Sequence, residues 1–293
     1  MKLGFIGFGE AASAIASGLE ADGLSGIRAF DAMANDATMG KLVHKRAEAT
    51  GVELVDSAKA LVEGVDIIMT VVPPVLSLGV CEGIVEFLKP GQIYVDVTAA
   101  LPDNKIKMAD MVQAKGALYA DVAMLGSVPK DKHKVPITAS GKGAAKYKEI
   151  MAPYGMKINL AGEVPGSAAA IKLVRSVFMK GIATLMLEML EAANAYGVTE
   201  EVVTSIGKSM DGIAFTSHLD RLITGTAIHC KRRSGELAGS IDLLEAKKLG
   251  AEMTMASKAK MEKLIDYKFM ERFVDRKPEG YQEIIDILSK EHK

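Results

Sequence analysis

The sequence has no tryptophan and only two cysteines, Cys81 and Cys230, among its 293 residues. Two cysteines are too few for a disulfide framework, and neither belongs to a CxxC pair or to a zinc-binding spacing. No charged and apolar leader with a small-residue cleavage site stands before the first strand pattern. We therefore expect reduced thiols, no metal site and a cytoplasmic protein.

An excess of charge of one sign and a long apolar run are missing as well. The formal net charge is -1, so the whole chain lacks the positive footprint that nucleic-acid binding requires. Although 49% of the residues are hydrophobic, no uninterrupted apolar run reaches the roughly 18 residues of a membrane helix. We expect neither nucleic acid nor membrane as a partner. The length is sufficient for two domains, each with its own core.

A glycine motif follows the first apolar run. Residues 2–6 predict a strand, which meets the sequence GFGEAA and then a helix pattern that stops at Gly23. This fits the dinucleotide fingerprint, in which Gly7 makes the turn, Gly9 admits a pyrophosphate and Ala12 allows close helix packing. The helix N-terminus adds free N–H groups and a positive dipole end. The residues assigned to the cofactor here are Gly7, Phe8, Gly9, Glu10, Ala11 and Ala12.

The next apolar run, residues 27–30, ends at Asp31. An acidic residue about 20 positions past the fingerprint accepts hydrogen bonds from the adenosine ribose, and it repels a 2′-phosphate. We therefore expect NAD as the cofactor, with NADP less favoured. Asp31 as an ordinary turn residue remains an alternative, since no arginine follows to decide the matter.

Alternating strand and helix patterns continue through the first half and predict a parallel, doubly wound sheet. Ligands bind beyond the carboxyl ends of such strands, which assigns Val72, Pro73 and Thr98 to the cofactor site. Pro73 and Pro74 could equally be strand terminators. The strands expected are residues 52–55, 66–72, 92–97, 118–124, 135–139 and 156–160, with a helix at 57–63.

After the strand at 118–124, Gly126 and Ser127 offer backbone N–H groups that could hold an anion. The basic run at 130–134 is interpreted as a solvated loop. From residue 165 strand patterns disappear. The sequence therefore predicts a dinucleotide-binding Rossmann domain at 1–162 and an all-helical substrate and dimerisation domain at 163–293, an α/β fold followed by an all-α domain.

Residues 166–196 predict a long helix that is apolar on nearly every side, which is typical of a buried core helix. Its polar residues recur at every fourth position and form one stripe. Because burying an amine is costly, Lys172 in this stripe is a candidate active-site residue. The alternative is that the stripe faces solvent. Its members are Lys172, Ser176, Lys180, Thr184 and Glu188.

Shorter helices are expected at 199–207, 213–222 and 229–250. The last one begins with a basic segment that contains His229 and the cations at 231–233. Three adjacent cations usually form a solvated face, but an arginine turned toward a cleft would clamp a carboxylate. His229 and Arg233 are therefore candidates for substrate binding.

Four segments together resemble the β-hydroxyacid dehydrogenase family, which includes 3-hydroxyisobutyrate and 6-phosphogluconate dehydrogenases. They are GFGEAA, DVTAALP from Asp96, DVAMLGS from Asp121 and GSAAAIKLVRS from Gly166. The resemblance implies a Rossmann domain, an all-helical second domain, a homodimer built largely on that domain, and Lys172 as the catalytic acid/base.

The chain also departs from the family. Leu125-Gly126-Ser127 stands where a Ser-Gly-Gly substrate loop is usual, and Arg175-Ser176 where two asparagines are usual. The segments RSVFMKG and HCKRRSGEL resemble a branch with a C-terminal domain of unknown function. We therefore expect this chain to have the fold of the family but not the family's substrate.

The function predicted is NAD(P)-dependent, reversible hydride transfer between nicotinamide and the hydroxyl-bearing carbon of a small acidic substrate. Lys172 would exchange the hydroxyl proton, with burial and the positive charge of Arg175 lowering its pKa. Ser176, one turn on, would orient the substrate oxygen. Imine reduction, against which the lysine argues, and a non-catalytic NAD-binding regulator are the alternatives. The substrate contacts expected are Gly126, Ser127, Arg175, His229 and Arg233.

Overall fold

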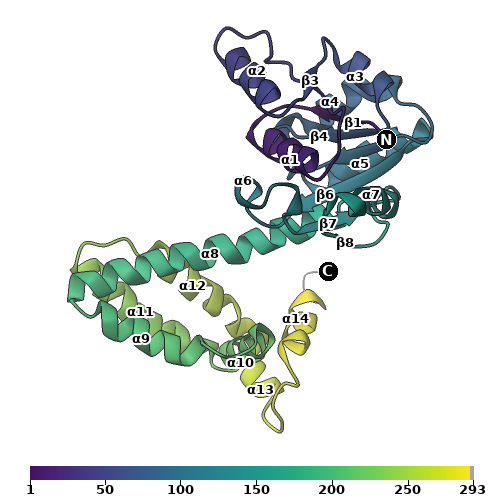
Figure 1. Cartoon of the computed structure of the whole chain (residues 1–293). Coiled ribbons are helices and arrows are strands. Elements are labelled where there is room, and N and C mark those ends of the chain that lie inside the picture. Colours follow the sequence, from purple (N-terminus) through teal and green to yellow (C-terminus); the bar gives the residue numbers. More distant parts are fainter. Residues whose placement is uncertain (291–293) are drawn as a thin grey trace. The chain divides into compact units, whose positions relative to one another are not determined.

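The computed structural model describes residues 1–290 and divides into two compact units, Met1–Val177 and a second unit that starts at Phe178. The division falls inside one helix, α8 (Ser167–Tyr196), which begins in the first unit and ends in the second (Figure 1). The domain boundary expected after residue 162 lies just before this helix and stays a prediction.

The first unit contains an eight-stranded sheet with the order β3-β2-β1-β4-β5-β6-β7-β8. The chain runs outward from β1 to one edge and then from β4 to the other, as in a doubly wound fold. The Rossmann-type first half that the sequence predicted is confirmed. Its strands are β1 (Leu3–Ile6), β2 (Arg28–Phe30), β3 (Glu53–Leu54), β4 (Ile67–Thr70), β5 (Ile93–Asp96), β6 (Leu118–Met124), β7 (Ile137–Ser140) and β8 (Ile158–Leu160).

One strand pair departs from the expected parallel order. β6 and β7 pair antiparallel, with Asp121 opposite Ser140. The connection between them, residues 125–136, holds only a short helix and a 3-10 turn, whereas a parallel crossover usually contains a full helix. The antiparallel return brings the carboxyl end of β7 beside the middle of β6.

Helices cover both faces of the sheet (Figure 1). Alternate strand residues enter two separate cores: Phe5 and Val95 pack with α1 (Glu10–Ala21), whereas Ile6 and Tyr94 pack with α5 (Pro102–Ala114). This alternation follows from the period of two of a β-strand. The other helical segments are α2 (Met39–Ala49), α3 (Ala58–Gly64), η1 (Pro74–Leu76), α4 (Ser77–Ile84), η2 (Val85–Phe87), α6 (Val128–Asp131), η3 (Lys132–Lys134), α7 (Ala144–Met151) and η4 (Ala152–Tyr154).

The basic run at 130–134 is only partly the solvated loop that was expected. Lys130, Lys132 and Lys134 are exposed, but His133 is 3% exposed and lies against α1. Its Nε2 atom is 2.9 Å from Asp22, and the Lys134 amine is 2.7 Å from the same carboxylate. Both contacts lower the pKa of Asp22, that of Lys134 most. The run therefore anchors η3 to the end of α1.

The second unit is helical throughout residues 178–290, as the sequence predicted. Its small core contains Ala227, Phe269, Phe273 and Ile284. No helix in the described part of the chain is long and apolar enough to cross a membrane. After α8 come α9 (Thr199–Met210), α10 (Phe215–Ile228), α11 (Cys230–Ala246), α12 (Glu252–Lys263), η5 (Ile265–Tyr267), α13 (Phe269–Arg272) and α14 (Tyr281–Lys290).

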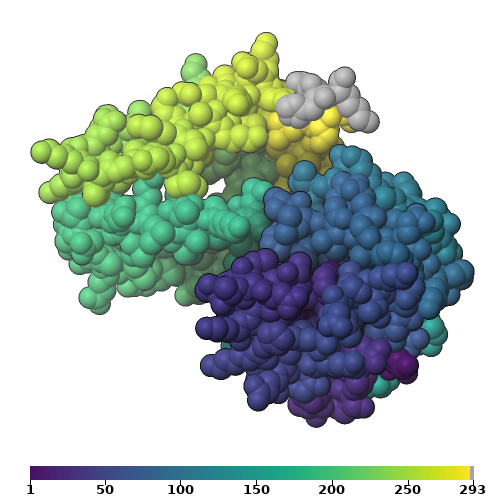
Figure 2. All heavy atoms as spheres, turned by 90° about the horizontal axis from the view of Figure 1, so that it is seen from above, coloured from purple at the N-terminus to yellow at the C-terminus, as the bar shows by residue number. Residues whose placement is uncertain are grey.

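The expectation that α8 is a buried core helix is wrong for this chain. Val174 and Val177 are 69% and 76% exposed, and Leu187 is 61% exposed. The polar stripe is in part more buried than these apolar residues, because Glu188 is only 7% exposed and accepts hydrogen bonds from the first turn of α12. Figure 2 shows openings between the teal atoms of α8 and the yellow-green atoms of later helices in the second unit. The apolar character of α8 is therefore not explained by packing within one chain.

Candidate active site

The glycine turn after β1 has the geometry that a dinucleotide site needs. Gly7 has φ 83°, and a Cβ there would lie 2.4 Å from the carbonyl oxygen of Val71. Only glycine fits this position. Gly9, the N-cap of α1, has open space around its missing Cβ and provides no side-chain cap for the helix. The first turn of α1 thus presents its N–H groups to open space, which is a fitting cradle for a phosphate.

Asp31 holds this turn in place. Its carboxylate accepts hydrogen bonds from the backbone N–H of Phe8 at 2.6 Å and of Met33 at 2.8 Å. The turn role that the sequence left open is therefore present. Since a carboxylate has further lone pairs, the bond to Phe8 leaves acceptor capacity for a ribose hydroxyl.

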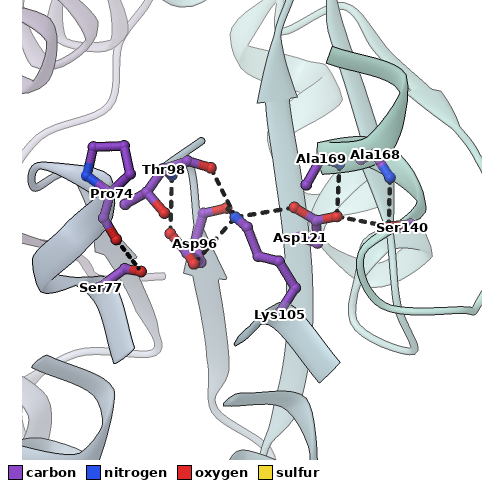
Figure 3. A network of polar contacts seen from close by, with 9 residues as sticks. All are labelled: Pro74, Ser77, Asp96, Thr98, Lys105, Asp121, Ser140, Ala168 and Ala169. Atoms are coloured by element: carbon purple, nitrogen blue, oxygen red, sulfur yellow. Dashed lines mark hydrogen bonds and ion pairs between the residues drawn. The ribbon is translucent and has the colours of Figure 1, made fainter. Parts of the chain in front are cut away.

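A buried ion cluster lies between the carboxyl end of β5, at Asp96, and the middle of β6, at Asp121 (Figure 3). The Lys105 amine, from α5, is 3.1 Å from the Asp96 carboxylate and 3.0 Å from the Asp121 carboxylate, and all three side chains are fully buried. It also donates to the backbone oxygens of Asp96 at 3.1 Å and Thr98 at 2.8 Å. Such a charged cluster is stable in the interior because its partners satisfy one another.

The same cluster anchors the start of α8. Asp121 accepts a hydrogen bond from the backbone N–H of Ala169 at 3.0 Å and another from the Ser140 hydroxyl at 3.1 Å. The N–H of Ala168 donates to the Ser140 oxygen at 3.0 Å. Two strands thus supply the cap that the first turn of α8 needs, and a carboxylate at a helix N-terminus is electrostatically favoured. Figure 3 shows this link from Lys105 through Asp121 to α8.

Lys172 lies one turn beyond this anchor and is half-buried. Burial lowers the pKa of its amine, the positive charge of Lys105 lowers it further, and Asp121 opposes the shift. The nearby cation is therefore Lys105 and not the exposed Arg175 that the sequence suggested. Ser176 is half-buried and donates its hydroxyl proton to the backbone oxygen of Lys172 at 3.1 Å.

The other cofactor candidates lie where strands β4 and β5 end. Val72 is half-buried, and its Cγ1 atom is 2.8 Å from where a Cβ on Gly7 would lie. Pro73 is exposed and precedes η1, while Thr98 is 5% exposed beside the ion cluster. These residues share the edge of the sheet that carries the glycine turn.

The substrate candidates are divided between the two units. Gly126 and Ser127 are exposed just past β6, in the same unit as Lys172 and Arg175. His229 and Arg233 belong to the second unit, where Arg233 donates to the Thr226 hydroxyl at 2.7 Å. The first four candidates therefore belong to the unit that carries the glycine turn, and the last two belong to the second unit.

Sequence reasoning missed Lys105 and gave no role to Ser140. Lys105 stands in a helix pattern where lysine is ordinarily solvated, and its partners come from strands 9 and 16 residues away. The only signal was the pair of aspartates, Asp96 and Asp121, within two apolar strands that are adjacent in the sheet. Two buried carboxylates on neighbouring strands require a cation.

The fold and the glycine turn together define a dinucleotide-binding protein of the Rossmann class. Residues 2–162 match the family described as the NAD binding domain of 6-phosphogluconate dehydrogenase, and the chain belongs to this family. Residues 193–264 match a domain of unknown function, DUF1932. The family resemblance that the sequence suggested, including the branch with an uncharacterised C-terminal domain, is confirmed.

Relatives and solved structures agree with this assignment. An uncharacterized 28.5 kDa protein of Methanothermus fervidus is 29% identical over 81% of this chain and 88% of its own length. A conserved hypothetical protein of Sinorhizobium meliloti is 27% identical, with a TM-score of 0.62 over 99% of this chain and 96% of that one. An imine reductase from Pseudomonas sp. is 17% identical, with a TM-score of 0.72 over 92% and 95%, which shows a shared fold.

Proposed function

We propose that this protein is an NAD-dependent oxidoreductase that transfers a hydride reversibly between nicotinamide and the hydroxyl-bearing carbon of a small acidic substrate. The observation that carries the proposal is Lys172, a half-buried amine whose pKa is lowered chiefly by burial, on the unit that bears the glycine turn. An amine of lowered pKa can accept the hydroxyl proton during oxidation and return it during reduction. Bound NAD would supply the hydride acceptor.

The residues of the glycine turn would hold the cofactor. The N–H groups of Glu10 and Ala11 in the first turn of α1 face the space at Gly9 and would bind the pyrophosphate. Asp31 would accept from the adenosine ribose. Asp36 lies close by in sequence, and hydrogen bonds from the N–H groups of Met39 and Thr38 lower its pKa, so it too is a carboxylate. Two carboxylates after β2 favour NAD over NADP, because they repel a 2′-phosphate.

The acidic group of the substrate would be bound near Lys172. Arg175 is exposed on the same helix, and its planar guanidinium can pair with a carboxylate in two places. Ser127 and the N–H groups after Gly126 would add neutral donors. Ser176 would orient the substrate oxygen, and His229 and Arg233 are the candidates for substrate binding on the second unit.

The test is the substitution Lys172→Met, which keeps an unbranched side chain of similar length and removes the titratable amine. We expect turnover of a panel of hydroxyacids, followed at the absorbance of reduced nicotinamide, to fall by about 10²- to 10⁴-fold. Lys180→Met, an exposed lysine two turns further along the polar stripe, is the matched control and should retain turnover. NAD binding, measured by thermal shift, should be nearly equal in both variants. Full turnover by Lys172→Met would refute the role of this amine.

Reduction of an imine is the second candidate, favoured by the likeness in fold to proteins described as imine reductases and reductive aminases. The lysine at position 172 argues against imine reduction, because that reaction usually requires a proton donor whose pKa differs from that of a lysine. Oxidation of amines but not of hydroxyacids would favour this candidate. Binding of NAD without turnover of either panel would favour a regulatory protein.

We also propose that the chain forms a homodimer through α8. Val174, Val177 and Met186, which lie on different sides of this helix, are 69%, 76% and 50% exposed, and an exposed apolar surface of this kind is typical of an interface. A stable dimer buries roughly 1,200 Å² or more in total. Val177→Glu should yield monomers in light scattering, while Val274→Glu, at a residue 75% exposed outside α8, should not. A dimer that survives Val177→Glu would contradict the proposal.

A further inference from the structure

Lys105 is a fully buried cation of the site, and the proton-transfer proposal gives it no role. It is fully buried, so it cannot touch a substrate. Its amine nevertheless contacts the one carboxylate, Asp121, that also binds the first turn of α8. Replacing Lys105 alone by an apolar residue would leave the Asp96 and Asp121 carboxylates buried without a cation, which is strongly destabilising.

Two effects of Lys105 converge on Lys172. The first is mechanical: Lys105 fixes Asp121, Asp121 binds the N–H of Ala169, and Lys172 follows three residues later on the same helix. The second is electrostatic, because two positive charges in a buried region disfavour one another. In such a region the screening by water is weak.

The charges that face Lys172 come from two elements. Lys105 on α5 favours the neutral amine, and Asp121 on β6 favours the charged amine. Asp96 on β5 pairs with Lys105 and is not among the groups that shift Lys172. On α8 itself Arg175 is exposed, and Ser176 donates its hydroxyl proton to the backbone oxygen of Lys172. Lys105 and Asp121 therefore act on Lys172 with opposite sign.

We propose that Lys105 is a positioning residue that holds the first turn of α8 through Asp121 and, by its own positive charge, favours the neutral form of the Lys172 amine. This inference rests on the proposed role of Lys172 in proton transfer. Lys105 does not contact the substrate, but on this proposal it controls whether the Lys172 amine carries a proton.

The tie between α5 and α8 is reinforced at their first residues. Gly166, immediately before α8, has φ 90°, and a Cβ there would lie 3.0 Å from atoms of Pro102, the first residue of α5. The backbone of one helix start therefore touches the other. The helices that carry Lys105 and Lys172 are therefore tied together by this contact and by the Asp121 bridge.

The experiment compares three variants of the full chain. Asp96→Asn keeps Lys105 and should leave the pKa of Lys172 near its wild-type value. The double variant Lys105→Met/Asp96→Asn has the same net charge in the cluster as the wild type, because it loses one cation and one anion, and it should raise the pKa of Lys172. Asp121→Asn removes the opposing anion and should lower it.

The pKa is read from the side-chain ¹³C shifts of labelled lysine as a function of pH, with the Lys172 signal assigned by its loss in Lys172→Met. Thermal unfolding establishes that each variant is folded. If the double variant does not fold, Lys105→Gln/Asp96→Asn takes its place, since glutamine can still donate to Asp121. Opposite shifts in the double variant and Asp121→Asn support the proposal, because a merely structural role would move both in the same direction.

A second readout separates this inference from the proposed function. The acidic limb of the pH profile of kcat/KM should move to higher pH in the double variant, with about a tenfold loss of neutral amine for each unit of rise. Shifts in the NMR titration without any effect of Lys172→Met on turnover would refute the proposed function and leave the inference about Lys105 intact. An unchanged titration in the folded double variant would overturn the inference.

Discussion

The substitution Gly9→Ala separates the needs of the fold from those of the cofactor. Gly9 has φ -78° and ψ -164°, which alanine adopts without strain, and the added Cβ meets no atom within 4 Å. Replacing glycine at an unstrained position stabilises by about 0.4–1 kcal/mol through the unfolded chain, and the poorer N-cap quality of alanine offsets roughly 0.5–1 kcal/mol of this. We therefore expect the free energy of unfolding to change by less than about 1 kcal/mol.

The effect on NAD binding should be much larger. The open space at Gly9 is where a pyrophosphate would approach the first turn of α1, so a methyl group there displaces the phosphate from its donors. Loss of one charge-assisted hydrogen bond costs about 1.5–3 kcal/mol, which corresponds to a roughly 10- to 150-fold weaker Kd. Isothermal titration calorimetry with NAD, together with thermal unfolding of the free protein, measures both quantities.

Gly7→Ala is the contrasting control. Its φ of 83° and the 2.4 Å approach to the carbonyl oxygen of Val71 predict a loss of folding stability, with the left-handed backbone alone costing about 1–2 kcal/mol. If Gly9→Ala bound NAD as tightly as the wild type while remaining folded, the assignment of the glycine turn to a pyrophosphate would be refuted.

Three further predictions concern the anchoring of α8. Gly166→Ala should destabilise the protein by more than about 1 kcal/mol, because its φ is 90° and the Cβ would press on Pro102; denaturant unfolding with an unchanged midpoint would contradict this. Ser140→Ala leaves the N–H of Ala168 without its acceptor and should cost about 1–3 kcal/mol, measured in the same way. Glu188 is buried, which raises its pKa, but its hydrogen bonds from Thr254 and from the N–H of Met253 outweigh this and lower it from 4.5. A lowered carboxyl pKa means that the unfolded chain binds the proton more readily, so the stabilisation is complete above pH 4.5 and is lost as the pH falls through the lower folded value. The difference in melting temperature between wild type and Glu188→Gln should therefore be constant near neutral pH and should shrink below pH 4.5. A difference that does not depend on pH would contradict this role of Glu188.

Much of the fold could be predicted because local patterns determine it. The strand at 118–124 was predicted at its observed bounds, and α8 was predicted to within one residue. Both are long segments whose composition favours one structure, and the glycine turn needs only local geometry. The direction of β7 was missed, because periodicity reports that a strand exists and not how it pairs.

The candidate site was predictable only in part. Lys172 was singled out because a lysine in an apolar helix is unusual, and its lowered pKa agrees with that reasoning. The cation beside it was misassigned to Arg175, because helix geometry relates residues on one helix and is silent on α5. Lys105 becomes conspicuous only when strands β5 and β6 bring Asp96 and Asp121 together around it. Contacts between elements distant in sequence are not encoded in any local pattern.

Asp31 has a structural role that does not depend on a nucleotide, because its carboxylate accepts a hydrogen bond from the backbone N–H of Phe8. Replacing Asp31 with a neutral or basic residue to change the coenzyme would therefore also remove the hydrogen bond that holds the glycine turn. The exchange would succeed only with a second change that offers Phe8 a new acceptor. Under the proposed function, the choice of coenzyme and the shape of the loop would both depend on the Asp31 carboxylate, so that a substitution there would change both.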